Sequence, residues 1–69
     1  MEFRISYALE LLRSGRIKMI QDECDNAFWI DDDGQICSDD WTNNEYSITR
    51  MTDDEFVKRY SDSLFIEVG

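Results

Sequence analysis

Carboxylates are the most abundant groups in this sequence that could take part in chemistry, since 16 of the 69 residues are Asp or Glu. Histidine is absent, which removes the commonest general base, the usual partner of a nucleophilic serine or cysteine, and the commonest metal ligand. So many acids on a small domain must include close pairs, and nothing marks out one pair as an acid and base couple. We therefore expect no catalytic residue, no cofactor and no enzyme activity.

The segment 31–34, Asp-Asp-Asp-Gly, is the best candidate for a metal site. A calcium loop of the EF-hand type has acids at its first, third and fifth positions and glycine at its sixth. Aligning Gly34 with that glycine places Trp29 at the first position and Asp40 where a bidentate Glu is needed. The match fails at both ends, so we predict a hairpin turn here and no metal site.

The two cysteines, Cys24 and Cys37, have neither a C-x-x-C spacing nor further Cys or His at zinc-like intervals. We expect both to be thiols in a reducing compartment. No stretch approaches the roughly 20 apolar residues of a membrane span, and the first residues lack a basic region followed by an apolar run. The sequence thus predicts a protein without a membrane segment that stays in the cytoplasm of the cell that makes it.

The acids are concentrated in one stretch of the chain, between Lys18 and Arg50, where there is no Lys or Arg. The flanks together hold seven acids and seven bases, so the middle carries the whole net charge of −9. The nine acids of this stretch are Asp22, Glu23, Asp25, Asp31, Asp32, Asp33, Asp39, Asp40 and Glu45.

A charge run is often only a solvated surface, but aromatic residues stand among these acids. Phe28, Trp29, Trp41 and Tyr46 could anchor an interface. An acidic surface repels nucleic acid phosphates and attracts the basic groove of a protein that binds nucleic acid. We therefore expect no direct binding of nucleic acid, and we predict a partner-binding surface made by the nine acids and Trp41.

The first predicted element is a helix over residues 7–13, with Ser6 as its N-cap and Gly15 as a left-handed C-cap. Its apolar stripe consists of Ile5, Ala8, Leu9 and Leu12. A second helix is predicted over residues 53–60. Its signature is the capping box of Thr52 and Glu55, with Met51 and Phe56 as a hydrophobic staple.

Five short segments are predicted strands: residues 17–20, 27–30, 35–38, 46–49 and 64–68. Residues 22–26 are predicted to be an acidic turn, and residues 39–44 a polar loop around Trp41. Alternation puts Phe28 and Ile30 in the core and Trp29 on the other face of the sheet, where it is exposed or lies in a subunit interface.

The order α-β-β-β-β-α-β predicts a single α+β domain over residues 1–69, with two helices covering an antiparallel sheet of about four to five strands. A domain of this size buries only about 60% of its unfolded surface. Its stability is then marginal, which favours a homo-oligomer or a bound partner.

The opening motif, Phe3-x-x-x-x-Ala8-Leu9-Glu10-Leu11-Leu12-x-x-Gly15 followed by a short strand, resembles that of small phage proteins related to the Thoeris anti-defence family. The ending, from Met51-Thr52-Asp53-Asp54-Glu55-Phe56 to the segment 64–68, is similar to the acidic helix and terminal strand of that family. The likeness covers most of the chain in element order.

The chain departs from that family after the first strand, where Gln21-Asp22-Glu23-Cys24 replaces a basic Arg-Lys-Gly-Trp segment. The family sequesters a cyclic nucleotide signal in pockets at subunit interfaces, and an acidic segment serves an anionic ligand poorly. The concentrated acidic charge together with this resemblance favours a phage-encoded, non-enzymatic inhibitor of a bacterial defence system, such as CRISPR or restriction, acting in the host cytoplasm. Its expected partner is a defence protein with a basic nucleic-acid-binding surface.

Two other interpretations remain open. In the first, the protein is an oligomeric sponge for a cyclic nucleotide, with Arg16, Lys18 or Arg50 contacting phosphate and Trp29 or Trp41 stacking on a base. In the second, it is a structural or regulatory phage protein without a role in defence. Tight nucleotide binding by the isolated protein would distinguish the sponge.

Overall fold

The computed structural model describes residues 1–42 and 44–68, apart from the side chains of residues 40–42. The described residues form six strands and two helices in the order β-α-β-β-β-β-α-β. The strands are β1 (Phe3–Arg4), β2 (Ile20–Asp22), β3 (Ala27–Ile30), β4 (Ile36–Thr42), β5 (Glu45–Met51) and β6 (Leu64–Glu67). The helices are α1 (Ile5–Ser14) and α2 (Asp53–Arg59). The predicted α+β class is confirmed, with the short strand β1 as an addition.

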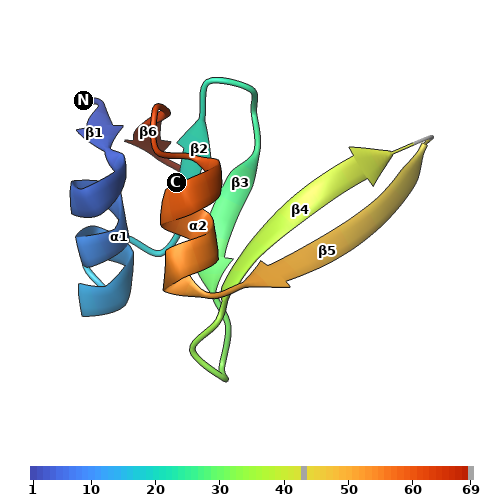
Figure 1. The fold of residues 1–69 in the computed structure, drawn as a ribbon, viewed down its shortest axis with the longest axis horizontal. Helices are drawn as coiled ribbons and strands as arrows, with labels where there is room; N and C mark the ends of the chain where they lie inside the picture. The colour runs from blue at the N-terminus through green and yellow to red at the C-terminus, as the bar shows by residue number, and fades with distance from the viewer. Residues whose placement is uncertain (43, 69) are drawn as a thin grey trace.

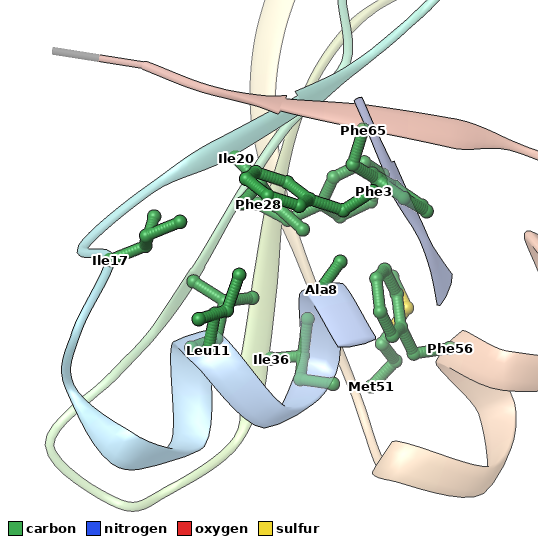
Figure 2. Close-up of a cluster of buried hydrophobic side chains, with 11 residues drawn as sticks. Phe3, Ala8, Leu11, Ile17, Ile20, Phe28, Ile36, Met51, Phe56 and Phe65 are labelled. Atoms are coloured by element: carbon green, nitrogen blue, oxygen red, sulfur yellow. The ribbon is translucent and has the colours of Figure 1, made fainter. Parts of the chain in front are cut away.

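The strands form one antiparallel sheet in the order β1-β6-β2-β3-β4-β5. The last strand, β6, lies between β1 and β2, so the prediction that it pairs inside the sheet is confirmed. Both helices lie on the same side of the sheet, and the buried side chains fill the space between the two layers (Figure 1 and Figure 2). No helix in the described part of the chain covers the other side, which we call the open face.

Aromatic side chains form the centre of the core. The rings of Phe28, Phe56 and Phe65 are fully buried, and their centroids lie 5.2 to 5.8 Å apart at angles of 45° to 77°. Such edge and tilted contacts are favourable beyond the apolar area that they bury. Ile30 packs against this cluster, so the assignment of Phe28 and Ile30 to the core face is confirmed.

Helix α1 differs from its prediction at its start. It begins at Ile5, and Arg4 occupies the N-cap position without a side-chain hydrogen bond, so the assignment of Ser6 as the cap is wrong. The strand β1 runs directly into the helix, so Ser6, two residues after Arg4, already lies inside the first turn. At the other end Gly15 has φ of 78°, the left-handed cap that was predicted.

The segment after Gly15 is also shorter as a strand than predicted, because β2 begins only at Ile20. Ile17 is buried, but its N–H donates to the carbonyl of Leu11 at 3.3 Å. Ile17 is thus bonded to the last turn of α1 and packs its side chain in the core, and it is not part of the sheet.

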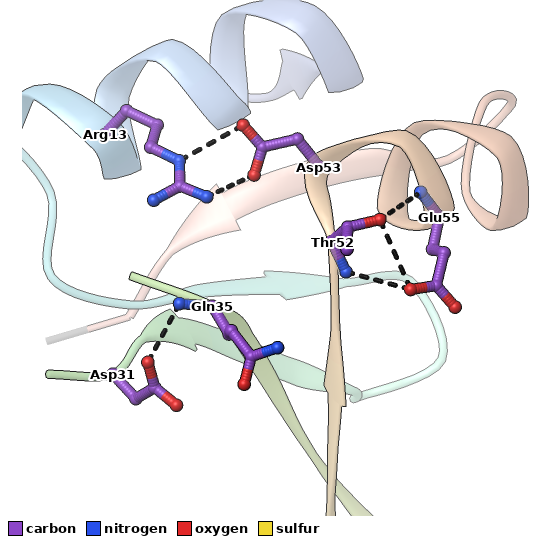
Figure 3. Close-up of polar contacts among 6 residues, drawn as sticks. All are labelled: Arg13, Asp31, Gln35, Thr52, Asp53 and Glu55. Carbon is purple, nitrogen blue, oxygen red and sulfur yellow. Dashed lines mark hydrogen bonds and ion pairs between the residues drawn. The ribbon is translucent and has the colours of Figure 1, made fainter. Parts of the chain in front are cut away.

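Helix α2 carries the predicted capping box (Figure 3). The Glu55 N–H donates to Thr52 Oγ1 at 3.2 Å, and the Thr52 N–H donates to Glu55 Oε1 at 3.1 Å. The bond from the Thr52 N–H is the main reason why the pKa of Glu55 lies below its ordinary value. Met51 and Phe56 are buried in the same cluster, in agreement with the predicted staple. The helix ends at Arg59, one residue earlier than expected.

The predicted polar loop over residues 39–44 is wrong, because residues 39–42 continue β4 and pair with β5. Strand β3 pairs with β4 only as far as Ser38, so residues 39–42 and 45–48 project beyond the sheet as a two-stranded arm (Figure 1). The four arm residues on β5, 45–48, are exposed to solvent. Asn44, at the tip, has φ of 65°.

Candidate protein-binding surface

The first acidic turn, between β2 and β3, is organised by Asp22. This residue is 6% exposed, and its carboxylate accepts bonds from the N–H groups of Cys24 at 3.0 Å and Asn26 at 2.9 Å. The Asn26 side chain donates a third bond, at 3.0 Å. Asp22 therefore holds the turn together and presents little of its charge to a partner.

The neighbouring acids of this turn are exposed. Glu23 Oε2 accepts a bond from the Leu64 N–H at 3.0 Å, which ties the turn to the start of β6. Asp25 has φ of 67°, and its carboxylate accepts a bond from Gln21 at 3.3 Å. Both carboxylates keep surface open to solvent, so both can attract a cation.

The second acidic turn, between β3 and β4, is organised by Asp31, whose carboxylate accepts bonds from the Gln35 N–H at 2.8 Å and the Asp33 N–H at 3.0 Å (Figure 3). The bond from Gln35 is the main reason why the pKa of Asp31 lies below its ordinary value, and Arg50, 3.2 Å from Asp31 Oδ2, adds to this. Gly34 has φ of 82°, so the predicted Asp-Gly turn is confirmed.

Two basic side chains lie close to this second turn. Arg50 is one of them, and the guanidinium of Arg13 is the other. Arg13 Nη1 lies 3.6 Å from the position that a Cβ on Gly34 would occupy. Arg13 also pairs with Asp53 and so joins the two helices (Figure 3). Asp32 and Asp33 are exposed in this environment, where their charge is partly balanced.

The two acidic turns lie at opposite ends of the sheet, because β2, β3 and β4 are consecutive antiparallel neighbours (Figure 1). The nine acids predicted as one surface therefore form separate groups. The arm points toward the same end as the β2–β3 turn and carries Glu45, which is exposed. The side chains of Asp40 and Trp41 lie outside the described part, although the backbone register pairs Trp41 with Tyr46.

Asp39 has a structural role where the arm leaves the sheet. Its Oδ1 accepts a bond from the Ala27 N–H at 3.1 Å, at the position where the ladder between β3 and β4 ends. The carboxylate also lines a polar hollow of about 310 Å³ between the base of the arm and the end of α2, together with Asn26, Ser38, Thr49, Met51, Arg59 and Tyr60. Asp39 thus satisfies a backbone donor that the sheet leaves open.

A shallow pocket of about 240 Å³ lies at the end of the sheet that holds the β2–β3 turn. Its walls contain four acids, no basic residue and an apolar portion from β6. The lining residues are Glu2, Gln21, Asp22, Glu23, Asp25, Leu64 and Ile66. We call the three exposed acids of this pocket, Glu2, Glu23 and Asp25, the acidic end.

Four of these lining residues were not predicted as site residues from the sequence: Gln21, which precedes the acidic turn, and Glu2, Leu64 and Ile66. Glu2, Leu64 and Ile66 come from the flanks of the acidic stretch, and only the insertion of β6 beside β2 brings them to the β2–β3 turn. Ile66 is 43% exposed and lies on the open face. The sequence analysis did predict that the last strand pairs inside the sheet, and this prediction could have indicated that residues of β6 lie beside the acidic turn.

The residues expected to hold a nucleotide do not form one site. Trp29 and Arg50 occupy the open face on either side of Cys37, and Trp29 is half-buried there. Arg16 and Lys18 lie in the connection between α1 and β2. Neither the acidic pocket nor the polar hollow includes any of the four.

The cysteines are free thiols in different settings, Cys24 exposed and Cys37 buried. Burial is the main reason why the pKa of Cys37 is raised, and its Sγ donates to Asp31 Oδ2 at 3.6 Å. A raised pKa keeps this thiol protonated, which makes it a poor nucleophile. Within the described residues, no three Cys, Asp or Glu side chains are grouped to hold a metal ion.

In the described part of the chain, the two helices, α1 and α2, are too short and too polar to cross a membrane. In comparisons with known proteins, no family model, no curated protein and no solved structure matched this chain.

Proposed function

We propose that this protein is a non-enzymatic, phage-encoded inhibitor that occupies a basic, nucleic-acid-binding surface of a bacterial defence protein. The observation that carries the proposal is the acidic end, where three exposed acids line a pocket that no basic residue lines. The assignment to phage and to defence rests on the resemblance of the opening and closing motifs to the Thoeris anti-defence family.

The chemistry of the acidic end suits a Lys or Arg side chain of a partner. Its carboxylates can pair with the cationic head, while Leu64 and Ile66 offer apolar surface to the aliphatic stem. Charged groups at such a surface act mainly on the rate of association and on the choice of partner. The β3–β4 turn is less suited, since Arg13 and Arg50 already accompany it.

A pull-down from bacterial lysate tests the proposal. Tagged protein should capture a DNA- or RNA-binding protein at low salt, and both high salt and added double-stranded DNA should release it, because nucleic acid competes for the same basic surface. In a separate gel-shift assay the protein alone should not bind that DNA. Capture that withstands salt and DNA contradicts the proposal. An empty pull-down together with tight binding of a cyclic nucleotide in calorimetry would establish the sponge instead.

Two charge-matched variants then test the location. Glu2→Gln/Glu23→Gln/Asp25→Asn removes three charges at the acidic end and keeps the side-chain shapes. Glu10→Gln/Asp32→Asn/Asp33→Asn removes three charges elsewhere. The first should weaken binding of the captured protein by about tenfold or more, mainly through slower association, and the second should have a small effect. Equal losses would show that net charge alone governs binding.

A further inference from the structure

The sheet has two edges that differ in length. At one edge β1 contains two residues, and at the other β5 contains seven. An edge strand presents unpaired N–H and C=O groups, and proteins usually protect such an edge from pairing with another chain. Shortness protects β1. The outer side of β5 has no neighbouring strand in the described sheet, and the arm carries it away from both helices (Figure 1).

The devices that usually block an edge are missing from β5. The chain has no proline, β5 has no lysine, and β5 pairs with β4 one to one from Glu45 to Met51, without a bulge. Its centre, from Tyr46 to Thr49, is uncharged, and Tyr46 and Ile48 are 51% and 44% exposed. β-branched and aromatic residues such as these favour strand pairing.

We propose that β5 is a self-association edge at which a second copy of this chain pairs antiparallel with the first. A two-fold axis through such a pair must place residues of the same sheet face opposite each other. With Ser47 opposite Ser47 of the second copy, Tyr46 stands opposite Ile48, which is a favourable aromatic and β-branched pair. The pairing covers residues 45–49 of each copy, a length of about 14 Å.

The charges of β5 fit this register. Glu45 stands opposite Thr49 of the other copy, and Arg50 lies beyond the last pair, so no like charges face each other across the new ladder. The net charge of −9 on each copy nevertheless opposes association at longer range. A dimer held by one strand pair and opposed by net charge is weak, and added salt should strengthen it. Binding to a basic partner has the opposite salt dependence, and it does not require the dimer.

Sedimentation equilibrium of the full chain tests this inference. At low millimolar concentration we expect a population with twice the monomer mass. The association constant should rise as sodium chloride increases from about 0.1 M to about 1 M, which shortens the Debye length from about 10 Å to about 3 Å. A monomer at every concentration up to about 1 mM, the range of the weakest specific affinities, overturns the proposal.

A pair of double variants locates the interface. Ser47→Lys/Ile48→Lys places like charges opposite each other on the edge and should leave the protein monomeric. Val57→Lys/Ile66→Lys makes the same charge change at residues of similar exposure on α2 and on the open face, and it should keep the dimer. Dimerisation that survives the edge variant, or that only the second variant abolishes, overturns the assignment to β5. Circular dichroism melts at low concentration check that both variants fold.

Discussion

The two acidic turns of the sheet share one backbone design and differ in their surroundings. In each, an Asp carboxylate accepts the N–H groups two and four residues later: Asp22 serves Cys24 and Asn26, and Asp31 serves Asp33 and Gln35. In each, the residue three positions later has a positive φ and donates its N–H to the Asp carbonyl. Each is a three-residue hairpin loop of the type that ends in a left-handed residue.

The residues around each turn determine whether its acids can serve as a recognition surface. Asp31 borders Arg50, Arg13 lies close to Gly34, and charge at that turn is partly balanced. Asp22 is buried beneath its turn, while the acids around it face an unbalanced pocket. The same local sequence chemistry therefore gives one end of the sheet a turn whose charge is partly balanced and the other end a negative surface. The tertiary neighbours make this difference.

The largest expected effect in this comparison is that of Asp22→Ala. The change leaves the N–H groups of Cys24 and Asn26 without their acceptor in a partly buried turn, and it should lower the free energy of unfolding by about 2 kcal/mol. Urea denaturation followed by tryptophan fluorescence measures it. Asp31→Ala, in the exposed turn, should lower stability less.

The conservative variant Asp22→Asn retains one acceptor oxygen and should recover part of this loss. Equal stability of Asp22→Ala and the unaltered protein would contradict the assigned role. In that case water would have to satisfy the two N–H groups, and the two turns would differ less than their burial indicates.

The sequence predicts the positions where the chain turns better than the lengths of the strands between them. Gly15, Gly34 and the Thr52 capping box each mark a backbone requirement that few residue types meet, and each was located correctly. Residues 39–42 were mistaken for a loop because their two Asp and one Thr are typical of loops, whereas their backbone pairs with residues 45–48 of β5.

The candidate site follows from the sequence only in part. The excess of acids between Lys18 and Arg50 is evident from composition, but their division between two ends depends on the antiparallel order of β2, β3 and β4. Glu2 and Ile66 join the pocket only through the placement of β6. Long-range pairing of this kind leaves no local pattern in a single sequence.

A smaller effect is expected from changing the residue that adopts the left-handed backbone conformation in each turn, Gly34 or Asp25. Gly34→Ala should lower the free energy of unfolding by about 1 kcal/mol, because φ of 82° is strained for a residue with a Cβ. The added Cβ would meet only Arg13 Nη1, at an ordinary contact distance, so backbone strain is the main term. Urea denaturation at neutral pH measures the change.

Asp25→Gly is the reciprocal change and should have the opposite sign. It relieves φ of 67° and should raise stability by a few tenths of a kcal/mol, less than Gly34→Ala lowers it, because Asp tolerates the left-handed region better than most residues. If both variants lowered stability equally, the two turns would not share the backbone design described above.

The smallest expected effect is a difference in pH dependence. The pKa of Asp31 lies below its ordinary value, chiefly through the Gln35 N–H, so the folded state favours the ionised form. This contribution is fully present above the unfolded pKa, near pH 4, and is lost as pH falls through the lower folded pKa. Asp31→Asn cannot titrate, so its unfolding free energy should fall less steeply below about pH 4 than that of the unaltered protein.

Urea denaturation in steps from neutral pH to about pH 2.5 gives the two profiles, which should converge at the acid end because the protonated Asp31 no longer gains from its ionised state. Asp32→Asn is the matched control, since it removes the same formal charge one residue away and none of the hydrogen bonds that organise the turn. It should keep the steepness of the unaltered protein. A flattened profile for Asp32→Asn as well would mean that net charge, and not the turn built on Asp31, sets the acid sensitivity of this end of the sheet.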